Sequence, residues 1–180
     1  MKILTLNCEY DRHFDLIFPF FSQEQPDVLC IQEIFEQDVP LFIERTGLTH
    51  VNFVANAIID APNIYDIPPR GKWGIATFSK TPFLAEKRFV YAGDFDQVPI
   101  FVNHQPNSVR RNLIATVVEG PNGPLTIANT HFTWTPDGNT SQLQIDHVQK
   151  VLAIIDQIQP CILCGDFNAP RGKEIFDTLA

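Results

Sequence analysis

Apolar residues follow two different periods along the chain of 180 residues, which predicts a mixture of strands and helices. Short runs rich in Val, Ile, Phe and Thr predict strands at residues 2–8, 26–34, 50–58, 72–80, 82–93, 110–120, 124–132 and 161–167. Helical spacing predicts helices at residues 11–25, 36–48, 140–158 and from 172 to 180. The order of these elements, with helices outside mostly antiparallel strands, favours an α/β sandwich of layers.

The predicted helix at 140–158 has the clearest pattern, because Val148, Val151, Leu152 and Ile155 keep the spacing i, i+3, i+4 and i+7. The helix at 11–25 contains Pro19, which we expect to distort the helix or to restart it. Gly47 is expected to end the helix at 36–48.

Two segments rich in Pro, Asn and Asp, at 60–72 and 95–109, predict surface loops, and the first is expected to border a functional site. Residues 119–125, with the sequence EGPNGPL, predict a hairpin connection. The run CILCGDF at 161–167 predicts a buried strand that ends on an acid. The chain has no repeat, low-complexity tract or linker in its sequence, so we expect residues 1–180 to form a single domain.

Composition narrows the class of protein. A hydrophobic content of 44% suits a sizeable core, and the formal net charge of -8 makes the chain as a whole repel polyanions such as duplex DNA. The N-terminal apolar run is too short for a signal peptide and no run is long enough for a membrane helix, so we expect a cytoplasmic protein without a membrane span.

Four cysteines lie in or beside apolar strand-like runs, which favours reduced, buried thiols over disulfides. Cys161 and Cys164 form one C-x-x-C pair, but a structural zinc site normally needs a second ligand pair, and the sequence shows none. In a strand these two side chains also point to opposite faces, which disfavours zinc further.

Polar residues interrupt the apolar runs at four predicted strand ends. They are Asn7, Gln32, Glu33, Thr130, His131, Asp166 and Asn168. Each has an ordinary structural explanation when taken alone, such as a helix cap, a turn or a half-buried ring. Taken together, they favour phosphate ester hydrolysis with Mg²⁺, which prefers oxygen ligands and needs only one or two protein groups.

The roles follow from side-chain chemistry. Glu33 is expected to be the main ligand of Mg²⁺, or of Mn²⁺ in its place, with Asn7 beside it. Asp166 is expected to orient and deprotonate the attacking water, with Asn168 holding that water or a phosphoryl oxygen. His131 is expected to donate to the phosphate oxygen on which charge develops.

Arginine and aromatic residues add candidates. Arg111 opens a predicted strand and can grip a phosphate with its planar fork, although an exposed strand position explains it equally well, and more so for Arg110. Trp73, Phe132 and Trp134 are candidates for a pocket that stacks a ring, against the alternative that they are simply packed in the core.

A set of motifs in this order and spacing resembles the endonuclease/exonuclease/phosphatase superfamily, whose fold is deoxyribonuclease I-like. The motifs are LTLNCEY, DVLCIQEI, WGIATFSK, RRNLIATV, IANTHF, SQLQIDHVQKVL and ILCGDFNAPRG. The resemblance implies a four-layer α/β sandwich with an Mg²⁺-dependent phosphodiesterase, nuclease or phosphatase site.

Carried over by position, the resemblance implies that Glu33 is the metal ligand with Asn7 next to it. His131 contacts the phosphate, and Asp166 and Asn168 handle the water and the transition state. Arg111 falls where several members hold a residue that contacts the phosphate.

Members of the superfamily also end with a second Asp and a Ser-Asp-His motif, which this sequence lacks. The resemblance therefore implies a catalytic domain without its C-terminal part, with the last strands of the second sheet missing. The chain is then expected to be a fragment, to have lost full activity, or to be completed by a partner. Sheet edges left unpaired would offer a route to self-association.

Two alternatives stay open. A calcineurin-like metallophosphatase also uses a Gly-Asp motif, but its further Gly-Asp and Gly-Asn-His motifs are not in the sequence. A binding module of the same fold, with an incomplete site, would bind phosphate without turnover. The substrate class is left as a phosphate ester, either a nucleic acid or a small phosphorylated molecule.

Overall fold

The computed structural model describes residues 1–93 and 96–179. Strands form at β1 (Ile3–Asn7), β2 (Val28–Phe35), β3 (His50–Ile59), β4 (Gly71–Ser79), β5 (Ala85–Ala92), β6 (Arg111–Gly120), β7 (Gly123–His131) and β8 (Cys161–Asp166). Helices form at α1 (Phe14–Glu24), α2 (Val39–Thr46), α3 (Gln142–Ile158) and α4 (Glu174–Leu179), with short 3₁₀ turns at Glu36–Asp38 and Pro136–Gly138. Phe95 and Ala180, which begin a predicted loop and end a predicted helix, lie outside the described residues.

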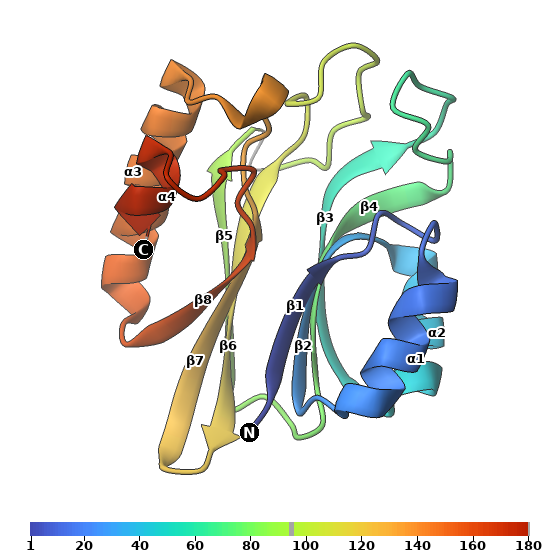
Figure 1. Cartoon of the computed structure of the whole chain (residues 1–180), viewed down its shortest axis with the longest axis vertical. Helices are drawn as coiled ribbons and strands as arrows, with labels where there is room; N and C mark the ends of the chain where they lie inside the picture. The colour runs from blue at the N-terminus through green and yellow to red at the C-terminus, as the bar shows by residue number, and fades with distance from the viewer. Residues whose placement is uncertain (94–95, 180) are drawn as a thin grey trace.

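Two four-stranded sheets pack face to face, with helices on both outer faces (Figure 1). The first sheet has the order β1-β2-β4-β3 and the second has the order β5-β6-β7-β8. Each is mixed, because β1 and β2 run parallel, as do β7 and β8, while the other neighbours are antiparallel. Helices α1 and α2 cover the first sheet, and α3 and α4 cover the second (Figure 1). The predicted α/β layers are therefore confirmed.

A separate apolar cluster packs each pair of helices against the sheet that it covers. Under α1 and α2, the buried rings of Phe21, Phe42 and Phe78 meet, with Phe42 and Phe78 stacked at 5.5 Å between ring centres. Under α3, Val148 and Val151 pack against the second sheet. The predicted periodicity of this helix is thus confirmed, with Ser141 capping it by accepting from the backbone N–H of Gln144 at 3.2 Å.

Two local predictions need correction, and a third is confirmed. Helix α1 begins only at Phe14 and runs on through Pro19, whose missing N–H costs one hydrogen bond but does not end the helix. The run CILCGDF is not a buried strand, because β8 has one neighbour, β7, among the described strands, and Ile162 is 41% exposed. The hairpin between β6 and β7 is as predicted, with Gly120 paired to Gly123.

Two further expectations concern the state of the cysteines and the presence of a membrane-spanning helix. All four cysteines are free thiols. Cys161 packs in the cluster under α3 whereas Cys164 lies between the sheets, so the two point to opposite faces as predicted. Among the residues that the structure describes, no helix is long and apolar enough to cross a membrane.

Gly165 allows β8 to approach β7 closely, just before Asp166. The two strands pair Thr130 with Gly165, and a Cβ at Gly165 would collide with the carbonyl oxygen of Thr130. We expect Gly165→Ala to lower the free energy of unfolding in urea by on the order of 3 kcal/mol. Gly47→Ala, where a Cβ meets open space and only the positive φ of 72° is strained, should cost about 1 kcal/mol. Equal losses would contradict the steric explanation.

Candidate functional site

The candidate site lies where the carboxyl ends of two parallel strand pairs meet, one pair from each sheet. Asn7 ends β1 and is paired with Gln32 of β2, while His131 ends β7 and is paired with Asp166 of β8. Side chains at the carboxyl ends of parallel strands are a common place for chemistry in α/β proteins. The fold therefore gathers residues that lie up to 159 positions apart in the sequence.

A β-bulge in β2 turns Glu33 into the site. The pairing of β2 with β4 shifts between Gln32 and Ile34, which leaves Glu33 as the extra residue. Its φ is 61°, a left-handed value that is strained for a residue with a side chain. The carbonyl of Glu33 accepts from the backbone N–H of Tyr10 at 3.1 Å, which holds this conformation. Bulges of this kind re-aim a side chain next to functional sites.

Asn7 joins the two carboxylates of the site. Its amide nitrogen donates to Oε1 of Glu33 at 3.0 Å and to Oδ2 of Asp166 at 2.8 Å. Its amide oxygen accepts from the backbone N–H of Glu9 at 3.0 Å. In this arrangement Asn7 faces the carboxylates with its nitrogen, so it positions them, and its predicted contact with a metal stays a prediction.

Glu33 is poorly compensated in charge. Burial is the largest cause that raises the pKa of Glu33 to about 7. The negative charges of Asp166 and Glu9 contribute to this rise, against the opposing effects of the Asn7 hydrogen bond and of Arg111. The site thus holds more negative charge than its own cations neutralise.

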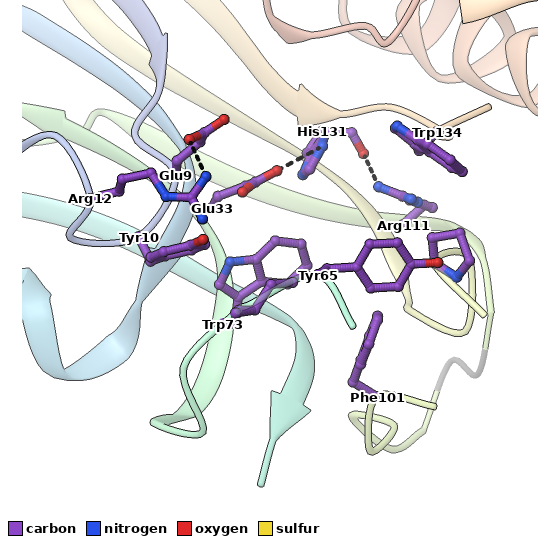
Figure 2. Close-up of a pocket in the computed structure, with 12 residues that line it drawn as sticks. Glu9, Tyr10, Arg12, Glu33, Tyr65, Trp73, Phe101, Arg111, His131 and Trp134 are labelled. Carbon is purple, nitrogen blue, oxygen red and sulfur yellow. Dashed lines mark hydrogen bonds and ion pairs between the residues drawn. The ribbon is translucent and has the colours of Figure 1, made fainter. Parts of the chain in front are cut away.

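His131 is a neutral imidazole beside these carboxylates. Burial and the charge of Arg111 lower the pKa of His131 to about 3. Its Nε2 lies 3.7 Å from Glu33 Oε1, the contact marked in Figure 2, and 3.9 Å from Asp166 Oδ2. These separations are longer than hydrogen bonds, and Nδ1 is buried without a partner in the structure. The imidazole ring therefore lies close to the carboxylates, and its N–H is still able to donate a hydrogen bond to a ligand.

Arg111 and Asn168 are tied to the same network. Arg111 is only 3% exposed and donates to the carbonyl of His131 at 3.1 Å. Asn168, at a φ of 48°, donates from its backbone N–H to Asp166 Oδ1 at 2.9 Å. Its side chain donates to the carbonyl of Phe132 at 3.0 Å. The alternative that Arg111 is an exposed strand residue is wrong.

The structure thus brings all six predicted site residues into one connected group. They are Asn7, Glu33, Arg111, His131, Asp166 and Asn168. Gln32 and Thr130, the other polar residues at the predicted strand ends, are buried and bonded within the fold instead. The catalytic roles of the six site residues stay predictions, since the geometry shows that they are close together and does not show turnover.

A cavity of about 180 Å³ opens beside this group, and sequence reasoning missed most of its wall (Figure 2). Glu33, Arg111 and His131 line one part of it. The remaining wall includes Glu9, Tyr10, Arg12, Tyr65, Ile67, Trp73, Phe101, Pro106 and Trp134. Trp73 and Trp134, two of the three aromatic candidates for a pocket, line this cavity.

Phe132 does not line this pocket, which corrects the prediction for that residue. It is fully buried and stacks on Tyr91 at 6.2 Å between ring centres. The missed residues Tyr65 and Phe101 lie on the two proline-rich loops, of which only the first was expected to border a site. That loop composition was the one available signal, because nothing in the sequence places the two loops side by side.

The donor set fits a hard divalent cation. Glu33 is a half-buried carboxylate that forms no ion pair with a Lys or Arg among the described residues, and Asp166 accepts a hydrogen bond from the same amide. A cation at Glu33 would relieve the cost that raises its pKa. No group of three or more His, Cys, Asp or Glu side chains that could hold a metal occurs among the described residues. Mg²⁺ needs fewer protein ligands than that, since it keeps several waters.

Residues 4–178 match the model of the Endonuclease/Exonuclease/phosphatase family. The chain belongs to this family. The predicted deoxyribonuclease I-like sandwich is confirmed, and the calcineurin-like alternative is wrong. The family consists of phosphoester hydrolases, typically dependent on a divalent metal.

Solved structures of the same fold agree. The catalytic domain of human nocturnin with bound sulfate matches with a TM-score of 0.69 at 21% identity, over 97% of this chain. A family protein from Leptotrichia buccalis matches at 0.68 and 16% identity, over 99% of this chain. The mannosyl-6-phosphatase of Bacteroides thetaiotaomicron matches at 0.67 and 12% identity, also over 99%. No curated protein matches the chain significantly in sequence.

The chain spans only part of these structures, namely 66% of the nocturnin domain, 73% of the Leptotrichia protein and 69% of the Bacteroides phosphatase. At this level of identity the likeness shows the fold. The activity of the whole protein is therefore a matter for proposal.

The raised pKa of Glu33 predicts a pH-dependent stability. Because folding raises this pKa from 4.5 to about 7, the folded chain binds the proton more tightly, and stability is lost as the pH rises through this interval. With chelator present, Glu33→Gln should therefore raise the free energy of unfolding by on the order of 2 kcal/mol at pH 8, and by less than half of that at pH 5. Urea unfolding at both pH values measures this.

The matched control is Glu44→Gln on the exposed surface of α2, which should leave stability unchanged at either pH. A gain from Glu33→Gln that is the same at pH 5 and pH 8 would show that the ionisation of Glu33 is not its cause.

Proposed function

We propose that the chain hydrolyses a phosphate ester with the help of a divalent metal, Mg²⁺ or Mn²⁺. The observation that carries the proposal is the partly buried group of Asn7, Glu33, His131 and Asp166 next to the guanidinium of Arg111. Family membership supports a phosphoester substrate.

Glu33 would hold the metal, with Asp166 near enough to share in binding or in orienting a water. When bound, the cation neutralises the carboxylates and withdraws charge from a phosphoryl oxygen. The other roles in hydrolysis would be carried by side chains of the protein. Asn7 donates to both carboxylates, which favours the ionised form of Glu33 and orients Asp166. Asp166 would then accept a proton from the attacking water.

His131 and Arg111 would serve the phosphate. A neutral imidazole keeps one N–H, and His131 can donate it to the oxygen on which negative charge develops. Two of the five N–H donors of Arg111 are committed, to the carbonyl of His131 and to Asn107. The guanidinium therefore holds the histidine in place and keeps donors and a positive charge for the phosphate.

The first test is hydrolysis of bis(p-nitrophenyl) phosphate and of p-nitrophenyl phosphate, with Mg²⁺ or with chelator. Metal-dependent turnover should fall at least 100-fold in Glu33→Ala and stay unchanged in Glu44→Ala, an exposed glutamate on α2. Turnover by Glu33→Ala at the rate of the parent would refute the role of Glu33. Mg²⁺ binding without turnover in the parent would favour the binding-module alternative.

A second test separates the water from the metal. Asp166→Asn keeps the shape of the side chain and removes its basicity, so turnover should fall about 100-fold or more while Mg²⁺ affinity changes by about threefold or less. Calorimetric Mg²⁺ titration beside the kinetic assay measures both. Parallel losses of similar size would show that Asp166 acts chiefly as a metal ligand.

A further inference from the structure

The cavity beside the catalytic group has two unlike ends. Glu33, His131 and Arg111 form a charged end, with Glu9 and Arg12 beside Glu33, and five aromatic rings form most of the remaining wall (Figure 2). The rings belong to Tyr10, Tyr65, Trp73, Phe101 and Trp134. A phosphate held at the charged end would place the group esterified to it among these rings.

The loop that supplies Phe101 is bonded both to β3 and to the loop that supplies Tyr65. Phe101 donates its backbone N–H to the carbonyl of Ile58 in β3 at 2.9 Å, and the N–H of Ile64 donates to Oδ1 of Asn103 across the two loops at 3.0 Å. The two rings meet edge to face with 6.0 Å between their centres. The aromatic end is therefore largely formed before a ligand arrives, which lowers the entropic cost of binding.

Asn107 connects the aromatic end to the charged end. Its amide oxygen accepts from Arg111 at 2.9 Å, and its amide nitrogen donates to the backbone carbonyl of Trp134 at 2.9 Å. One side chain thus links the backbone at Trp134 to the guanidinium of Arg111. Such a link suits a ligand that has a phosphate and a flat ring at a defined separation.

The lining chemistry favours a planar heterocycle over a bare sugar. The described residues that line the cavity include no Ser, Thr, Asn or Gln. Glu9, Arg12 and the tyrosine hydroxyls can bond sugar hydroxyls, but aromatic rings supply the largest part of the lining. Stacking on aromatic side chains contributes about 1–3 kcal/mol per base and needs no such partners. The cavity of about 180 Å³ is smaller than a typical site for a drug-sized ligand, at roughly 300–1,000 Å³, so it suits one ring system.

Resting on the hydrolase function proposed above, we propose that the substrate is a small nucleotide-like phosphoester whose base stacks among Tyr65, Phe101 and Trp134 while its phosphate meets Arg111 and His131. The net charge of -8 disfavours a long polyanion, which points to a mononucleotide-sized ligand and not a nucleic acid polymer. Tyr65 and Phe101 are then specificity-determining residues.

The chain offers a direct probe of this site, because its two tryptophans, Trp73 and Trp134, both line the cavity. Quenching of their fluorescence is titrated with AMP and with ribose 5-phosphate, in chelator so that no turnover occurs. AMP should quench saturably and bind at least about tenfold more tightly than ribose 5-phosphate. Tyr65→Ala should weaken AMP binding about tenfold and leave ribose 5-phosphate unchanged.

The matched control is Phe20→Ala, which removes a ring that is 46% exposed on α1 and should change neither affinity. The urea midpoint of each variant verifies folding. No saturable quenching by AMP, or equal affinity for AMP and ribose 5-phosphate, overturns the inference. So does a ten-residue oligothymidylate that binds more than tenfold more tightly than AMP, because the ligand is then a polymer.

The two proposals fail in different ways. Selective AMP binding without metal-dependent hydrolysis in the chromogenic assay would refute the hydrolase function and keep the base site. Hydrolysis that depends on Glu33, with no preference for AMP over ribose 5-phosphate, would keep the hydrolase and remove the base site.

Discussion

A buried hydrogen bond between the side chains of Gln32 and Asn129, at 2.7 Å, joins the two sheets across their interface. Asn129 also donates to the carbonyl of Ala76 in the first sheet at 3.0 Å. Any other placement of the sheets would leave these amides unbonded, at a cost of about 1–3 kcal/mol each. The candidate site depends on this constraint, because Asn7 and Glu33 belong to one sheet whereas His131 and Asp166 belong to the other. Their separations of a few ångström are set by how the sheets are joined.

The sequence could predict features that depend on neighbouring residues and site residues that belong to a short motif. The periodicity of α3, the turn at Gly120–Gly123 and the polar residues at strand ends are visible without coordinates, because each follows from the spacing of a few neighbouring residues. The bulge that turns Glu33 into the site is not visible in the sequence, since it depends on the pairing of β2 with β4. Tyr65 and Phe101 were missed for the same reason: their contact joins loops separated by two strands. Phe132 was misplaced because alternation along β7 and beyond does not say which face meets α3.

Electrostatics explains how an acidic chain can serve a phosphate substrate. The net charge of -8 gives no broad attraction for anions, and two carboxylates meet at the site itself. Arg111, buried and bonded to the backbone of His131, is the cation placed to meet a phosphate directly. A divalent ion at Glu33 would supply the rest and would reverse the local field. The raised pKa of Glu33 shows that the charged carboxylate is disfavoured in the fold without a bound cation.

Backbone strain links the two ends of the cavity. Glu9, Tyr10 and Glu33 all have positive φ, at 44°, 52° and 61°, in conformations that cost roughly 1–3 kcal/mol each for residues with side chains. The N–H of Tyr10 bonded to the carbonyl of Glu33 holds the strained segments against each other. Tyr10 lines the aromatic wall and Glu33 the charged end, so one hydrogen bond fixes a ring and a carboxylate together. Relaxing either segment would move both, which is a physical reason for the strain to persist if the cavity holds the ring and the phosphate of the proposed substrate.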